Sequence, residues 1–119
     1  MTRNARQLRD DALAIWHAGV QAVDSKQLIL DNVHLEGNQL IVDDACFDLE
    51  HVRRVLVVGA GKAGAGMSEG LEAVLGDSWL DSDKVFGWIN GPADRARSLR
   101  RIRSPSARPA AIDELTAAR

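Results

Sequence analysis

The residues best suited to chemistry form a glycine-rich turn with one lysine inside it. Lys62 lies in this turn, directly after the apolar run Val55–Val58, among four glycines: Gly59, Gly61, Gly64 and Gly66. A strand that enters a helix through such a turn leaves the first N–H groups of the helix unpaired, and these groups attract anions. Lys62 adds a full positive charge where a phosphoryl group in transfer would lie. The turn therefore predicts phosphate chemistry.

Two other interpretations of the turn stay open. In the first, the glycines only let the chain turn sharply and let the helix pack closely on the strand. In the second, Gly59, Gly61 and Gly64 fit the G-x-G-x-x-G fingerprint of dinucleotide binding. That fingerprint expects an acid about 20 residues further on, at the end of the next strand. Here the next strand ends at Ile89-Asn90, so nicotinamide-dinucleotide binding is the weaker alternative.

The elements that must position this turn form a βαβ unit. Four β-favouring apolar residues before Gly59 are typical of a strand buried on both faces, as in a parallel sheet. A helix is expected from about Lys62 to Leu75, ending at Gly76-Asp77. Val85–Ile89 is the second strand. The fold class predicted is α/β, with a Rossmann-like βαβ unit.

A helix, a short helix and a β-hairpin are expected before this unit. Residues 5–23 show apolar side chains at helical spacing, and the face they form is expected to pack on the core, with Trp16 among its residues. A short helix over 26–31 follows an N-cap at Asp24-Ser25. The hairpin covers 33–43, with Gly37-Asn38 in its turn.

Length and composition describe one small domain or a piece of a larger one. The chain has 119 residues, is 45% hydrophobic and 27% charged, and contains one cysteine, which excludes an internal disulfide. No apolar run is long enough to span a membrane, and no signal segment is evident, so a cytoplasmic location is expected. Two parallel strands and a hairpin make a thin core. We therefore expect an incomplete domain.

Basic residues gather at the C-terminal end. Residues 1–94 hold eight Lys or Arg and fifteen Asp or Glu, whereas residues 95–119 hold seven Arg and two acids. The chain divides accordingly into 1–94, the α/β part, and 95–119, an Arg-rich loop to about Pro109 followed by the start of a helix. Nucleic acid is not the expected partner, because no aromatic residue follows Trp88 to stack on bases. Trp88 itself is expected in the core.

Other reactive residue types have structural explanations. Cys46 lies in a pattern typical of a small buried hydrophobe. His17, His34 and His51 lack the spacing of metal ligands, so no metal site is predicted. Asp43-Asp44 could pair as carboxylates, but loop acids are normally solvated.

The run VLVVGAGKA at residues 55–63, followed by small residues and Met67, resembles the signature near the N-terminus of MOFRL-type glycerate 2-kinases. Members of that family are also labelled hydroxypyruvate reductases. The preceding helices, the hairpin and Phe47-Asp48-Leu49 agree with the resemblance, which covers about residues 5–90. A weaker match is Ala107–Ala110.

The resemblance implies a cytoplasmic ATP-dependent kinase that phosphorylates D-glycerate at its 2-hydroxyl with Mg²⁺. Lys62 would be the catalytic residue, and Gly59, Ala60 and Gly61 would bind substrate or phosphate through their backbone. Family members are several times longer, so this chain is expected to be a fragment, inactive alone and without the metal ligands. Gly64 and Gly66 replace alanines common in the family. The alternatives are a non-catalytic interaction fragment and a nicotinamide-dinucleotide-binding domain; oligomeric state is left open.

Overall fold

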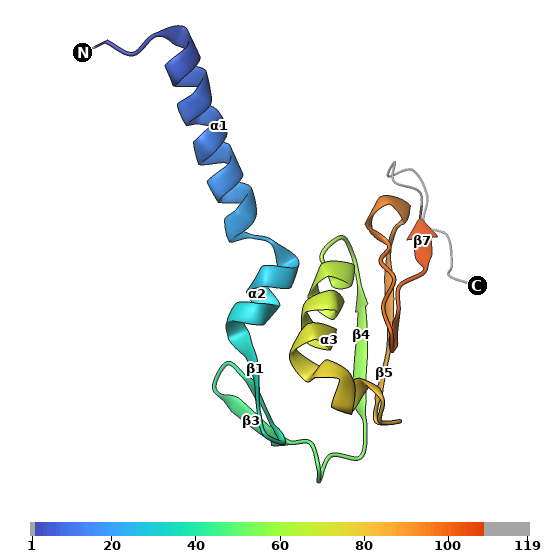
Figure 1. The fold of residues 1–119 in the computed structure, drawn as a ribbon. Helices are drawn as coiled ribbons and strands as arrows, with labels where there is room; N and C mark the ends of the chain where they lie inside the picture. Colours follow the sequence, from blue (N-terminus) through green and yellow to red (C-terminus); the bar gives the residue numbers. More distant parts are fainter. Residues whose placement is uncertain (1, 109–119) are drawn as a thin grey trace.

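The first half of the chain forms two helices and a small antiparallel sheet. The structure, a computed structural model, describes residues 2–108. It begins with α1 (Ala5–Ala22), which extends away from the rest of the molecule, and α2 (Ser25–Asn32) (Figure 1). Three strands follow in the order β1-β2-β3: β1 (Val33–Glu36), β2 (Gln39–Val42) and β3 (Ala45–Asp48).

The second half forms the predicted βαβ unit and its continuation. β4 (Val55–Ala60) pairs in parallel with β5 (Val85–Pro92), and α3 (Gly64–Leu80) connects them. Three short elements then follow: η1 (Ala93–Arg95), β6 (Ile102–Arg103) and β7 (Ser106–Arg108). Both β6 and β7 pair in parallel with β5. The predicted α/β class is confirmed.

Capping side chains set the ends of the two N-terminal helices. Asn4 Oδ1 accepts a hydrogen bond from Gln7 N at 2.9 Å, and Asn4 N donates to Gln7 Oε1 at 3.0 Å, which makes a capping box. Asp24 Oδ1 accepts from Gln27 N at 2.8 Å and starts α2 as predicted. Both predicted helices are confirmed within one or two residues.

The core lies where the antiparallel sheet, α3 and β5 meet. Its buried apolar residues are Val33, Leu40, Leu49, Leu75, Leu80 and Val85. Helix α3 bends inside this region, because Gly76 has φ 69° and ψ 178°, a conformation that glycine tolerates best. The predicted helix end at Gly76 is therefore a real break in the helix, after which one further turn reaches Leu80.

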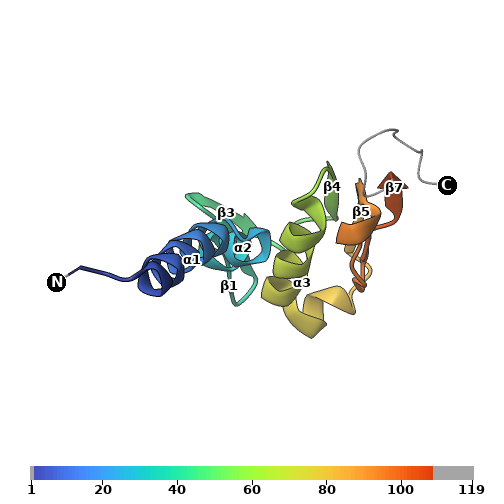
Figure 2. The same ribbon diagram turned by 90° about the horizontal axis from the view of Figure 1, so that it is seen from above.

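The expectation that α1 packs on the core is wrong in this structure. None of its residues is buried, and the side chain of Trp16 is 61% exposed. We call Leu8, Ala12, Ile15, Trp16 and Gly19 the apolar stripe of α1. Within residues 2–108 no element covers this stripe, since α1 points away from both sheets (Figures 1 and 2).

Three further expectations need correction. The segment after Val42 is a third strand, because Asp43 adopts φ 53° and turns the chain back into β3. Cys46 lies in that edge strand and is exposed, not buried. The stretch from Arg95 contains β6 and β7, so it is not simply a loop. The expected helix at 110–119 lies outside the described residues.

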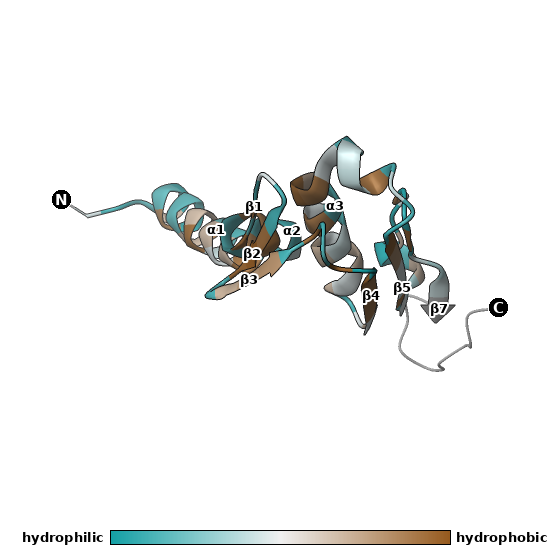
Figure 3. Cartoon of the chain, turned by 90° about the horizontal axis from the view of Figure 1, so that it is seen from below, coloured by the Kyte–Doolittle hydropathy of each residue, from teal (hydrophilic) through white to brown (hydrophobic). Residues whose placement is uncertain are grey.

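Trp88 is also more exposed than expected, at 37%. It lies on a face of the parallel sheet that no helix among residues 2–108 covers, although Figure 3 shows that β4 is strongly hydrophobic. The molecule is extended, because α1 projects away from the rest of the chain (Figure 1). Its radius of gyration is 18.4 Å, whereas a compact chain of this length has about 13–14 Å.

Candidate anion-binding site

The glycine turn places Lys62 and the start of α3 at the carboxyl end of β4. Gly61 adopts φ 115°, which side-chain-bearing residues rarely reach, and its N–H donates to Asn90 O at 2.8 Å. Helix α3 begins at Gly64, and its N-cap residue Ala63 makes no side-chain capping bond. The first N–H groups of α3 are therefore open to an anion.

Close packing explains why glycine stands at position 64. A Cβ added to Gly64 would lie 2.4 Å from Ile89 Cγ2, far inside van der Waals contact. The helix can therefore approach β5 only without a side chain there, as the glycine fingerprint requires. Near the carboxyl end of β5, which reaches Pro92, stands the uncharged Asn90, whose side chain accepts a hydrogen bond from Trp88 Nε1 at 2.8 Å.

A buried carboxylate holds the Arg-rich segment against the middle of α3. Glu72 accepts hydrogen bonds from three consecutive backbone N–H groups, those of Arg100, Arg101 and Ile102, at 2.8, 2.7 and 3.0 Å. Its side chain is thus the anchor that holds residues 100–102 against α3. The segment between β5 and this anchor must then pass beside the first turn of the helix.

Ion pairs to α3 neutralise much of the Arg-rich segment. Arg97 pairs with Glu69, and Arg100 bridges Asp77 and Asp81. Lys26 of α2 also donates to Glu69, at 2.9 Å. The hydrogen bond from Lys26, followed by that from Arg97, lowers the pKa of Glu69 below its usual value. These arginines are therefore used within the chain.

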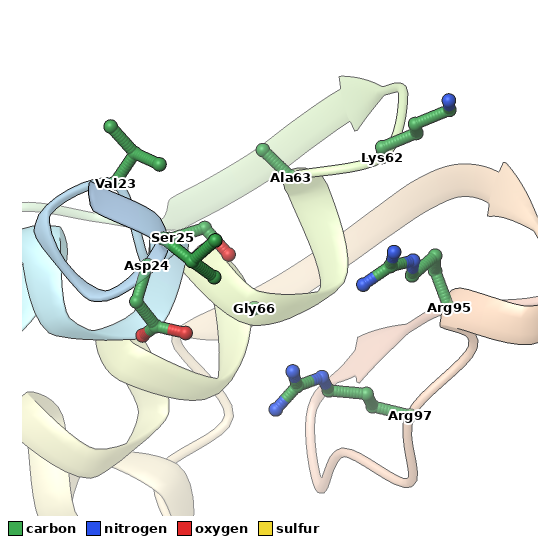
Figure 4. Close-up of a pocket in the computed structure, with 9 residues that line it drawn as sticks. Val23, Asp24, Ser25, Lys62, Ala63, Gly66, Arg95 and Arg97 are labelled. Atoms are coloured by element: carbon green, nitrogen blue, oxygen red, sulfur yellow. The ribbon is translucent and has the colours of Figure 1, made fainter. Parts of the chain in front are cut away.

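The cations meet in a cavity of about 280 Å³ between α2, α3 and η1. Its lining includes Lys62, Arg95, Arg97 and the first residues of α2 (Figure 4). Arg95 and Arg97 point toward the first turn of α3, whereas the Lys62 side chain extends outward. Lys62 is exposed and, within residues 2–108, makes no hydrogen bond or ion pair. It is thus free to turn toward an anion bound there.

The predicted site residues do not share one cavity. Lys62 lines the cationic cavity, whereas Gly59 and Ala60 line an apolar one of about 510 Å³ along β4, and Gly61 lines neither of the two. Sequence reasoning did not identify Arg95 and Arg97. The sequence does offer one indication of such partners. Glu69 and Glu72 lie three residues apart on the predicted helix, and both acids need cationic or N–H partners there.

The described residues hold neither a candidate metal cluster nor a helix of membrane-spanning character. Between residues 2 and 108, no group of three or more His, Cys, Asp or Glu side chains is placed to hold a metal ion. No helix in this part of the chain is long and apolar enough to cross a membrane.

Comparison with known proteins places the fold and the family. The structure is similar to the crystal structure of the PH0495 protein from Pyrococcus horikoshii OT3, with a TM-score of 0.62 and 21% identity. The match covers 90% of this chain but only 22% of that protein. No curated protein matches the sequence. Residues 11–117 match the family described as "Domain of unknown function (DUF4147)", and the chain belongs to that family.

Proposed function

We propose that this chain carries the phosphate-binding part of an ATP-dependent glycerate 2-kinase. The reaction would transfer the γ-phosphoryl group of ATP to the 2-hydroxyl of D-glycerate. The hydroxyl oxygen attacks phosphorus, the bond to the β-phosphate oxygen breaks, ADP leaves and the hydroxyl proton passes to a base. The acceptor and the reaction follow from the likeness of residues 55–67 to glycerate 2-kinases.

One observation carries the proposal. Arg95 and Arg97 line the cavity beside the first turn of α3, together with Lys62. Arg95 is paired with Asp94 and Arg97 with Glu69, so a bound anion would use the hydrogen-bond donors that these ion pairs leave free. Phosphoryl transfer depends mainly on positioning and on neutralising charge on the transferred group. Planar guanidinium groups suit this task, because each can donate two parallel hydrogen bonds to phosphate oxygens.

The described residues account for only part of such a site. The cations and the helix N-terminus fit the phosphates of ATP. They offer no cluster of three metal ligands, so the place of Mg²⁺ cannot be assigned to this chain. Because the chain spans 22% of the similar protein's length, the acceptor site and further catalytic groups would belong to a longer family member.

Binding of ATP–Mg²⁺ to the chain tests the proposal. A thermal melt followed by far-UV circular dichroism should shift upward with ATP–Mg²⁺, because a ligand that binds only the folded state stabilises it. Lys62→Ala and Arg95→Ala should each weaken binding by about 5- to 10-fold, the loss expected for one partly exposed charged contact. Equal affinity in both variants and wild type would disprove the assigned site.

A matched control separates a specific site from general charge. Arg54 is exposed and lies at the opposite end of β4 from Lys62. Arg54→Ala should therefore leave ATP affinity unchanged. Titration with NAD in place of ATP addresses the dinucleotide alternative, which predicts binding that survives Lys62→Ala.

A further inference from the structure

Within residues 2–108, the parallel sheet has one face without a covering layer. Ile89 faces α3, because its side chain lies against Gly64. Strand alternation therefore directs Phe86 and Trp88 to the other side. The register pairs Leu56 with Phe86 and Val58 with Trp88, so these four side chains form one patch. They are between 37% and 80% exposed, and we call them the open face.

A parallel sheet that exposes an apolar face to water is unusual. Strands of this type occur almost only where helices cover both faces, which is why their sequences are apolar throughout. Contiguous apolar patches on soluble proteins mark surfaces that meet a partner. The chemistry that fits the open face is the apolar side of an amphipathic helix.

The same chain carries such a helix. The stripe of α1 is as exposed to solvent as the open face: Ile15 is 73% exposed and Trp16 is 61% exposed. Helix α1 has 18 residues, which makes it about 27 Å long. Strand β5 has eight residues, which makes it about 26 Å long. The two surfaces therefore match in chemistry and length.

We propose that α1 of one copy covers the open face of a second copy, and that the exchange is reciprocal. A chain cannot make this contact with itself in the arrangement described, since α1 and the open face lie at opposite ends of the molecule (Figure 2). Two copies side by side, related by a two-fold axis, bury both stripes and both open faces. A two-fold arrangement closes at the dimer.

The accessible surface supports a partner of this size. It measures 8606 Å² for a chain of 12.9 kDa, whereas a compact monomer of that mass exposes about 6,300 Å². The excess is more than the roughly 800 Å² per partner that a standard protein–protein interface buries. An interface of that size with a second copy would bury part of this excess.

The first test is oligomeric state by size exclusion with light scattering. Wild type should be a dimer that dissociates on dilution. Ile15→Lys and Val58→Lys, each at an exposed position, should raise the dimer dissociation constant by about 100-fold or more, because each variant buries two charges in an apolar contact. A wild-type monomer at high concentration overturns the proposal, and so does growth beyond the dimer.

Matched controls show that the effect is local. Ala14 lies on the side of α1 away from the stripe, and Phe47 is an exposed apolar residue of β3 outside both surfaces. Ala14→Lys and Phe47→Lys should dimerise as wild type does. Loss of the dimer in either control would contradict the assigned surfaces.

Cross-linking identifies the contact itself. In a Cys46→Ser background, Trp16→Cys and Phe86→Cys are made as separate proteins and mixed under mild oxidation. A disulfide joining one copy of each is expected, since it needs a helix of one copy on the sheet of another. Dimers that cross-link only between identical variants would overturn the proposal and assign these surfaces to other partners.

Discussion

At the scale of single residues, the carboxylate of Glu72 controls more of the site than any residue within it. It is 8% exposed and accepts three N–H groups from residues 28 to 30 positions away. Without this acceptor, three backbone donors would lose their partner. Arg97 would keep its ion pair with Glu69, but the segment that carries Arg95 and Arg97 would lose its attachment to α3 at residues 100–102.

We expect Glu72→Gln to destabilise the protein by about 1–3 kcal/mol, because an amide offers one oxygen and no charge where the carboxylate offers two charged oxygens. Chemical denaturation measures this loss. Affinity for ATP–Mg²⁺ should fall too, although Glu72 does not line the cationic cavity. Glu36→Gln, at an exposed strand end, serves as the control. A variant as stable as wild type would show that the three hydrogen bonds contribute nothing.

At the scale of elements, the packing of α2 on α3 depends on missing side chains. A Cβ added to Gly66 would lie 2.1 Å from Ser25 Oγ, and one added to Gly70 would lie 2.8 Å from Lys26 O. Glycine inside a helix lowers stability by about 1 kcal/mol relative to alanine. The close approach of α2 explains why glycine nevertheless stands at position 66.

Gly70→Ala is therefore expected to destabilise the protein by about 1–2 kcal/mol, since the cost of overpacking against backbone exceeds the gain in helix propensity. The free energy of unfolding in urea measures it. Gly19→Ala makes the same change in α1, where nothing lies within 4 Å of the added atom. In dilute solution, where the proposed dimer is dissociated, that control should raise the helical signal in circular dichroism without loss of stability. Stabilisation by Gly70→Ala would contradict the tight contact.

Elements that depend on local signals could be predicted from the sequence. The two helices, the first hairpin and the strand–turn–helix–strand unit follow from caps, spacing and glycines near each other in the chain. Strand β3 was missed because Asp43 turns the chain in a conformation that favours glycine. Arg97 could not be placed from the sequence because its partner Glu69 lies 28 positions earlier, on α3, and no local signal placed Arg95 beside that helix. Lys62 could be singled out because its signal is confined to one turn; its role in the site stays a prediction.

At the scale of the whole molecule, stability is concentrated at one end. The core joins α3, β5 and the antiparallel sheet, whereas α1 buries no residue. An isolated helix of this length is marginally stable in water, since tertiary packing supplies most helix stability in proteins. The open face resembles the stripe of α1, because it is apolar and no other element within residues 2–108 covers it.

Amide hydrogen exchange should display this division directly. In dilute solution, amides of α1 should exchange orders of magnitude faster than those of α3 and β5, because local opening of α1 exposes no core. At high concentration, the protection of α1 and of β4 should rise together, while that of the core changes little. This joint rise is expected only if the stripe and the open face meet in the dimer. Protection of α1 equal to that of α3 in dilute solution would instead show that α1 is packed within a single chain, contrary to the arrangement described.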